Sequence, residues 1–171
     1  MDEILTGNNV YYPLAVGNKW NYQMKDGNTY YKSVTAVSPA NPSEFTMFNS
    51  LTNVNSIIRK ERVNYLTSSY DVSKMVVFMK DNLEKGDTFE MANTIGSILV
   101  VKVVDKGITK EVLGKAYTEV LLIEAERKMK NENIMGLNYF TRYYYALGIG
   151  LIETLTSMGD LHQLAALELK P

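Results

Sequence analysis

The first clear pattern in the chain is an alternation of apolar and polar residues that begins at Trp20. Trp20, Tyr22 and Met24 occupy every second position, and the residues between them are polar. Because successive side chains of a strand point to opposite faces, this pattern predicts a half-buried β-strand. The turn signal Asp26-Gly27-Asn28 follows, so the segment from Thr29 to Val37, rich in Tyr, Val and Thr, is expected to return as a hairpin partner.

Similar strand-like segments recur at short intervals along the rest of the chain. Between them stand Gly, Asn and Asp residues of the kind that tight reversals use, and the loop 38–43 contains two prolines. The further predicted strands span residues 44–49, 54–66, 70–80, 95–105, 108–113, 117–129, 138–146, 151–157 and 161–169. We expect the segment 54–66 to bend or bulge, and the apolar run 75–79 to be covered on both faces.

The last segment allows two interpretations. Residues 161–169 contain good helix formers, and Leu161, Leu164, Ala165 and Glu168 would share one face of a C-terminal helix. We favour a strand, because apolar residues alternate here and a Gly-Asp turn precedes the segment.

Regular strands without a convincing amphipathic helix predict a mostly β protein, all-β or α+β. We expect residues 11–171 to form a single domain with a curved antiparallel sheet, a half-barrel or open barrel, after a flexible lead over residues 1–10. Trp20 and the segment 143–152 both look core-forming, and neither can be buried alone. We therefore expect them in neighbouring strands.

Composition narrows the function classes. The 18 basic and 19 acidic residues leave a net charge of −1 without a long block of either sign, which argues against nucleic-acid binding. No cysteine is present, so disulfides and thiolate metal sites are excluded, and His162 is the single histidine. The aspartates are scattered, unlike those of a calcium loop. We expect no metal, no cofactor and no membrane-spanning segment, since the longest apolar run, 98–104, is too short to cross a bilayer.

Two local motifs could carry enzyme chemistry. Glu124 and Glu126 share one face of a predicted strand, at a spacing that hydrolytic carboxylate pairs could use. However, Lys128 continues the same face, as expected of a solvated surface beside a core face. Gly148-Ile149-Gly150 resembles part of a dinucleotide fingerprint but lacks its third glycine, so we interpret it as a bulge or a close backbone approach.

Aromatic residues supply the remaining signal. Tyr139, Tyr143 and Tyr145 should project to one side of a strand, while Arg142 projects to the other side with Phe140 and Tyr144. A concave sheet lined with such residues could hold an apolar ligand, and an exposed Tyr and Arg strip could bind a partner or a sugar. Our candidate ligand-binding residues are therefore Tyr139, Arg142, Tyr143 and Tyr145. A purely structural role is the alternative, because sheets are rich in tyrosine.

Four motifs occur in a characteristic order. They are Tyr12-Pro13-Leu14 with Gly17-Asn18-Lys19-Trp20, Gly86-Asp87-Thr88-Phe89, Gly114-Lys115-Ala116-Tyr117, and Tyr144-Tyr145-Ala146 with Gly148-Ile149-Gly150. In this succession the chain resembles a family of uncharacterised secreted or lipoprotein-like bacterial proteins common in Bacteroidetes. The resemblance implies a β-rich domain in the periplasm or at the cell surface, and it supplies no catalytic residue. The given chain has no signal peptide, which leaves a cytoplasmic location open.

Taken together, these observations favour a non-enzymatic, envelope-associated binding or scaffold domain. Its partner would be a hydrophobic, lipid-like molecule held against the curved sheet, or an envelope protein at an exposed edge. One alternative is a carbohydrate-active or other hydrolase that uses Glu124 and Glu126. The other is a purely structural or protein-interaction domain with a solid core. Neither the ligand nor the oligomeric state follows from the sequence.

Overall fold

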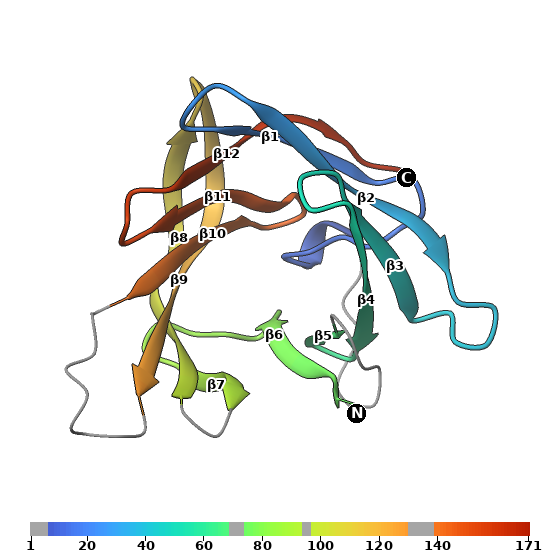
Figure 1. The fold of residues 1–171 in the computed structure, drawn as a ribbon, viewed down its shortest axis with the longest axis horizontal. Helices are drawn as coiled ribbons and strands as arrows, with labels where there is room; N and C mark the ends of the chain where they lie inside the picture. Colours follow the sequence, from blue (N-terminus) through green and yellow to red (C-terminus); the bar gives the residue numbers. More distant parts are fainter. Residues whose placement is uncertain (1–6, 69–73, 94–96, 130–138) are drawn as a thin grey trace.

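A computed structural model of the chain describes residues 7–68, 74–93, 97–129 and 139–171. In these residues an antiparallel sheet of 12 strands curls around a common interior and nearly closes into a barrel (Figure 1). The order of the strands is β6-β5-β4-β3-β2-β1-β12-β11-β10-β9-β8-β7, and the described residues contain no α-helix. The prediction of a mostly β, single-domain, curved antiparallel sheet is therefore confirmed.

The strands follow one another mostly as hairpins, so that neighbours in the sequence are usually neighbours in the sheet. Their bounds are β1 (Lys19–Met24), β2 (Thr29–Val37), β3 (Glu44–Asn49), β4 (Val54–Glu61), β5 (Asn64–Ser68), β6 (Val76–Lys80), β7 (Thr88–Asn93), β8 (Ser97–Val112), β9 (Lys115–Met129), β10 (Phe140–Ala146), β11 (Gly150–Thr156) and β12 (Leu161–Glu168). The long-range pairing is that of β1 with β12, which joins the two ends of the chain (Figure 1). The preference for a strand at the C-terminus is confirmed.

The structure differs from the predicted set of strands in three places. The segment 54–66 is divided between β4 and β5 by a tight turn, in which Arg62 has a positive φ of 55°. The two strands expected on either side of Gly107 form the continuous strand β8, with irregular pairing to β9 on both sides of that glycine. Strand β7 was not predicted, because its alternation is short and follows a run of turn-forming residues.

Strands β6 and β7 are the two ends of the sheet. They contact each other, and the Lys80 ammonium lies 5.2 Å from the centre of the Phe89 ring, but the ladder does not continue between them. The expectation that residues 75–79 are covered on both faces is wrong, because Val76 is 38% exposed. As an end strand, β6 lacks a second neighbour. The predicted strand residues 70–73 lie outside the described part of the chain.

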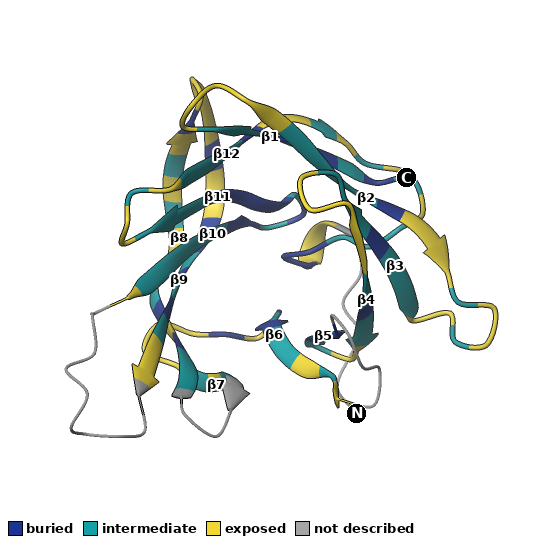
Figure 2. Cartoon of the chain, viewed as in Figure 1, coloured by how far each residue is buried: buried dark blue, intermediate teal, exposed yellow. Residues whose placement is uncertain are grey.

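The buried residues line the inner side of the barrel, whereas the hairpin tips are exposed (Figure 2). Trp20 and Tyr22 of β1 are among the most deeply buried side chains. The prediction that Trp20 and residues 143–152 lie in neighbouring strands is wrong, since β12 separates β1 from β11. Their side chains nevertheless meet. The Trp20 indole Nε1 donates to the Ile149 carbonyl at 2.8 Å, and the Tyr22 hydroxyl donates to the Leu151 carbonyl at 2.8 Å.

This contact explains the glycine at position 150. The ladder between β11 and β12 pairs only Glu153 to Leu155 of β11, so the Ile149 and Leu151 carbonyls lie beyond its end and are satisfied by β1 side chains instead. A Cβ atom on Gly150 would lie 2.8 Å from the indole nitrogen, and the residue has a φ of 113°. The interpretation of the Gly148-Ile149-Gly150 motif as a close backbone approach is therefore confirmed at Gly150.

The N-terminal segment bridges opposite sides of the barrel. The Val10 carbonyl accepts from the Gly148 amide at 2.7 Å, and the Tyr11 amide donates to the Asp81 carboxylate at 2.9 Å. Asp81 is buried and also accepts from the Tyr65 hydroxyl and the Lys60 ammonium. Of the lead expected over residues 1–10, residues 1–6 lie outside the described part, while Gly7–Asn9 form a 3-10 turn and Val10 is buried.

Candidate functional site

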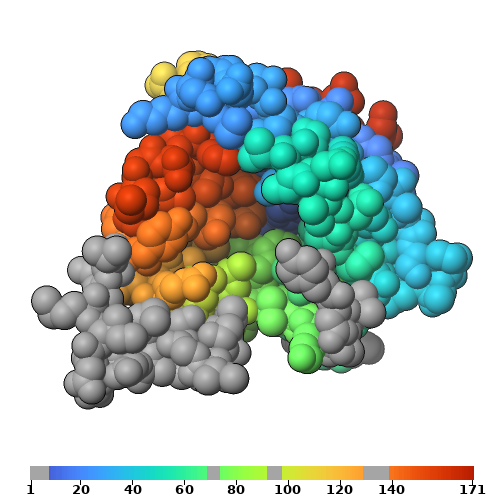
Figure 3. Space-filling view, in the orientation of Figure 1, coloured from blue at the N-terminus to red at the C-terminus, as the bar shows by residue number. Residues whose placement is uncertain are grey.

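The interior of the barrel holds a cavity of about 220 Å³ that opens to solvent. Figure 3 shows a hollow on one face of the molecule, between the teal β3–β4 region and the orange β10 region. The residues that line the cavity come from nearly every part of the sheet and from the N-terminal segment. They are Tyr12, Lys32, Met47, Asn49, Ser56, Ile58, Thr67, Phe78, Met91, Val101, Ile123, Tyr143, Tyr145 and Leu151.

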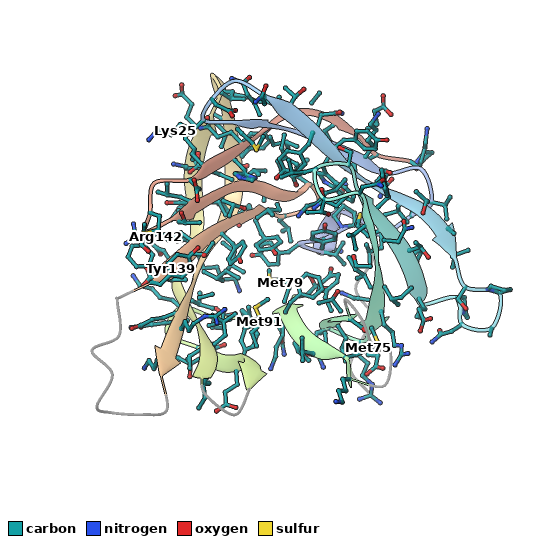
Figure 4. The ribbon with its side chains drawn as sticks, in the orientation of Figure 1. Lys25, Met75, Met79, Met91, Tyr139 and Arg142 are labelled. Carbon is teal, nitrogen blue, oxygen red and sulfur yellow. The ribbon has the colours of Figure 1, made fainter. Side chains whose placement is uncertain are left out.

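The strands β7 to β11 supply an apolar wall. Alternation along each strand places one or two side chains per strand on the cavity: Met91, Val101, Ile123, Tyr143, Tyr145 and Leu151. Figure 4 shows Met91 and Met79 pointing to the interior from β7 and β6. Tyr143 and Tyr145 lie with ring centres 6.5 Å apart, so an aromatic surface forms part of this wall. The wall can contact a hydrocarbon or a ring but offers little to a charge.

The strands β2, β3 and β4 supply a more polar wall. Lys32, Asn49 and Ser56 line the cavity from these three adjacent strands. Lys32 is paired directly with Asn49 across β2 and β3, and Ser56 of β4 is paired with Met47, two positions before Asn49 on β3. The three polar side chains therefore lie on neighbouring and diagonal positions of one face.

Lys32 is the charged group on this wall. Its ammonium lies 5.9 Å from the centre of the Tyr22 ring, and burial lowers the pKa of Lys32 from its ordinary value. His162 of β12 is nearby, and the pKa of its imidazole is lowered by burial and by the positive charge of Lys32. The His162 Nδ1 atom lies 2.5 Å from the Tyr30 hydroxyl. A neutral imidazole leaves Lys32 as the cation at this end of the cavity.

The tyrosines around the cavity stay neutral. Burial raises the pKa of Tyr12 and of Tyr145, and neighbouring phenols add to the effect. Burial also raises the pKa of Tyr30 to about 12. None of these phenols carries negative charge at neutral pH, so they do not neutralise Lys32.

The four candidate ligand-binding residues fall into two places. Tyr143 and Tyr145 lie on the cavity wall. Tyr139 is 40% exposed just before β10, and the Arg142 side chain is 41% exposed on the outer surface (Figure 4). The Arg142 Nε atom donates to Glu124 Oε2 at 3.0 Å, and its guanidinium lies 5.2 Å from the centre of the Phe140 ring. Of the four residues, Tyr143 and Tyr145 therefore line the cavity, whereas Tyr139 and Arg142 do not.

Glu124 and Glu126 lie on β9, on the face opposite the buried Ile123 and Ala125. Neither carboxylate lines the cavity. Glu124 is engaged by Arg142, so its charge is already balanced by a partner across the β9–β10 ladder. Glu124 therefore lies outside a dry pocket of the kind that a hydrolytic carboxylate pair uses.

Sequence reasoning missed the polar wall. Lys32 could have been predicted from the hairpin of β1 and β2. It is paired with Trp20 in this hairpin and therefore shares the inward face of Trp20. A lysine opposite a buried tryptophan was an available clue. Asn49 and Ser56 gave no comparable signal, because only the curvature of the sheet brings them to the same cavity as Tyr143 and Leu151.

The described residues contain no group of three or more His, Cys, Asp or Glu side chains that could hold a metal ion. Among the same residues, no helix has the length and apolar character needed to cross a membrane. His162 lies in β12, inside the sheet between β1 and β11.

Comparison with known proteins links this fold to two solved structures. One is a Parabacteroides distasonis protein described as a lipoprotein, with a TM-score of 0.58 and 11% identity over 96% of this chain and 100% of the other. The second is a Bacteroides fragilis protein described as exported and as having a YmcC-like fold, with a TM-score of 0.55 and 13% identity over 94% of this chain and 99% of the other. At these identities the likeness concerns the fold. No family model matches the chain, and no curated protein does.

Proposed function

We propose that this protein is a non-enzymatic binding domain that holds a small apolar or amphiphilic molecule inside its barrel. The observation that carries the proposal is the cavity of about 220 Å³ between an apolar wall and a more polar one. An apolar hollow of this size leaves side chains without the contacts of a solid core, and each lost contact removes dispersion energy. A purely structural barrel would be expected to fill the space with larger side chains.

The size of the cavity limits the ligand. An apolar cavity of about 150 Å³ in another protein accommodates benzene, so the present one suits a body somewhat larger than a single ring. Cavities for drug-sized ligands begin at roughly 300 Å³. The proposed ligand is therefore a small molecule or a single short chain rather than a complete two-chain lipid.

We also propose that the domain works in the cell envelope. Support comes from the descriptions of the two structural neighbours, of which one is called exported and the other a lipoprotein. The motif succession from Tyr12 to Ile152 points in the same direction. A hydrolase that uses Glu124 and Glu126 receives no comparable support, because the ion pair with Arg142 engages Glu124 outside the cavity.

Isothermal titration calorimetry with octanol tests the proposed function without requiring knowledge of the natural ligand. We expect saturable binding with a negative heat-capacity change, because apolar surface is buried. Ser56→Phe, which places a ring in the cavity, should weaken binding at least about tenfold, since overlapping volumes exclude the ligand. Asn55→Phe is the matched control: Asn55 is the preceding residue on β4 and is exposed.

Equal affinities of Ser56→Phe and the unsubstituted protein would contradict binding in this cavity. Native mass spectrometry of protein purified from cells, followed by organic extraction, complements the titration. A co-purifying small amphiphile is the expected result. Absence of binding by octanol and by its charged analogues of the same chain length would overturn the proposal and leave a protein-interaction domain.

A further inference from the structure

Two lysines project toward the interior of this barrel with very different surroundings. The Lys60 ammonium is paired with the buried Asp81 carboxylate and lies 3.8 Å from the centre of the Tyr65 ring. Lys32 borders the cavity, and among the described residues no carboxylate lies within ion-pair distance of it. Charges inside proteins are normally paired, because an unpaired one loses its hydration without compensation. The described part of the protein therefore supplies no counter-ion for Lys32.

Two neutral hydrogen-bond donors, the Asn49 amide and the Ser56 hydroxyl, line the cavity from the next two strands after that of Lys32. The Asn49 Oδ1 atom accepts from the Leu51 amide at 2.9 Å, which leaves the amide nitrogen of Asn49 as the free end of the side chain. Within the part of the chain that the structure describes, neither this nitrogen nor the Ser56 hydroxyl donates to a protein acceptor. Thr67 differs, because its hydroxyl donates to the Ile57 carbonyl at 3.1 Å. The polar wall thus presents an ammonium, an amide and a hydroxyl without protein acceptors.

The positions of these donors suit a single small anionic group. Lys32 and Asn49 are direct cross-strand partners, and Ser56 is the diagonal neighbour of Asn49. The opposite wall, from β7 to β11, is apolar and aromatic. The cavity is therefore itself amphipathic, with one charged side and one side for a hydrocarbon or a ring.

The charge balance indicates a monoanion. His162 is neutral because burial and Lys32 lower its pKa, and the surrounding phenols are protonated. Lys60 is already neutralised by Asp81. One lysine balances one carboxylate, whereas a phosphate monoester carries about −1.5 to −2 at neutral pH and would leave net charge in the cavity.

We propose that the cavity binds a small carboxylate amphiphile, with its head group on Lys32, Asn49 and Ser56 and its apolar body against β7 to β11. This inference rests on the proposed function, because it names the class of ligand for the same cavity. It predicts selectivity that an apolar void alone would not have.

The test compares three ligands with the same chain length: octanoate, octanol and octyl phosphate, each titrated into the full chain by calorimetry. We expect octanoate to bind about ten- to a hundredfold more tightly than octanol, since a charge-assisted hydrogen bond in a cavity contributes that much. Lys32→Met should abolish this preference, so that octanoate and octanol bind with equal affinity. Lys19→Met is the matched control, because Lys19 lies on the other face of β1, 4.2 Å from the centre of the Tyr31 ring.

A second variant guards against a folding defect. Ser56→Ala removes one hydroxyl donor and should weaken octanoate binding several-fold more than octanol binding, and circular dichroism verifies the fold of every variant. If octanoate and octanol bind equally to the unsubstituted protein, the inference fails while the proposed function stands. If none of the three ligands binds, the proposed function itself fails. Preferential binding of octyl phosphate would overturn the choice of a carboxylate.

Discussion

Lys32 combines a desolvated position, without an ion-pair partner among the described residues, with a place on the polar wall of the cavity. A lysine whose pKa is lowered by burial is held in an environment that disfavours its charged form. Natural proteins retain such residues where function needs them, at the expense of stability. Substitution of Lys32 should therefore change the stability of the fold and the binding of an anionic ligand in opposite directions.

We expect Lys32→Met to raise the free energy of unfolding by about 0.5–2 kcal/mol at neutral pH. The pKa of Lys32 is lower in the folded chain than its ordinary value of 10.5, so the folded state binds its proton less strongly than the unfolded state does. The destabilisation caused by charged Lys32 is complete at pH values below its pKa in the folded chain. It disappears as the pH rises past the pKa of Lys32 in the unfolded chain. The advantage of Lys32→Met should therefore shrink between neutral pH and about pH 10.

Urea unfolding at several pH values measures this difference, with Lys19→Met as the reference for loss of one positive charge. Equal stabilities of the two variants at neutral pH would show that burial of Lys32 is not a cost to folding.

Asp81 is the second residue whose substitution should change the stability of the fold. Its buried carboxylate accepts from the Tyr11 amide, the Tyr65 hydroxyl and the Lys60 ammonium. Asp81→Ala removes the acceptor of all three donors and leaves the Lys60 ammonium unpaired, so we expect the free energy of unfolding in urea to fall by about 3–5 kcal/mol. Adding Lys60→Met to Asp81→Ala should recover part of the loss. A double variant no more stable than Asp81→Ala would mean that the unpaired charge is not the main cost.

At the scale of the strands, the approach of β1 to β11 depends on the absence of a side chain at Gly150. Gly150→Ala would combine strain at a φ of 113° with a contact against the Trp20 indole. Gly27→Ala is the matched control, because Gly27 has a φ of 89° but nothing within 4 Å of the added Cβ. We expect about 1 kcal/mol of destabilisation for Gly27→Ala and at least about 2 kcal/mol more for Gly150→Ala.

Denaturation followed by the fluorescence of Trp20, the single tryptophan, measures both variants. Its emission should also shift in folded Gly150→Ala, because the indole loses its bond to the Ile149 carbonyl. Identical losses for the two glycines would indicate that the β1–β11 contact adjusts without strain.

At the scale of the whole molecule, the barrel has its weakest junction between β6 and β7. These strands end the sheet, and each has a ladder on one side only. Local opening is easiest where backbone groups lack a second neighbouring strand. By amide hydrogen exchange we expect β6 and β7 to exchange faster than β1 and β12, which lie in the middle of the sheet. Uniform protection across these four strands would contradict a seam at this position.

The same seam illustrates where sequence reasoning reached its limit. The strand at Glu44–Asn49 was predicted with its observed bounds, because alternation and turn residues are local signals. In β6 and β5 a bulge pairs Tyr65 with Met79 and Leu66 with Val77, so that Phe78 and Met79 both turn inward. Simple alternation cannot describe two adjacent inward residues. For the candidate site, Tyr143 and Tyr145 were selected from their aromatic character, but Lys32 was not, although its hairpin position was predicted.

The sequence by itself determined most of the strands, the mostly antiparallel curved sheet, and the absence of cysteine and of a strong charge bias. These properties follow from composition and from patterns within about ten residues, which a strand expresses wherever it lies. Only the tertiary structure decided that β1 pairs with β12, that β6 and β7 are the ends of the sheet, and that Lys32, Asn49 and Ser56 face Tyr143 and Leu151 across one cavity. The physical reason is that strand order, bulges and closure depend on contacts between residues far apart in the chain, and a shift of one residue in register moves every side chain to the other face.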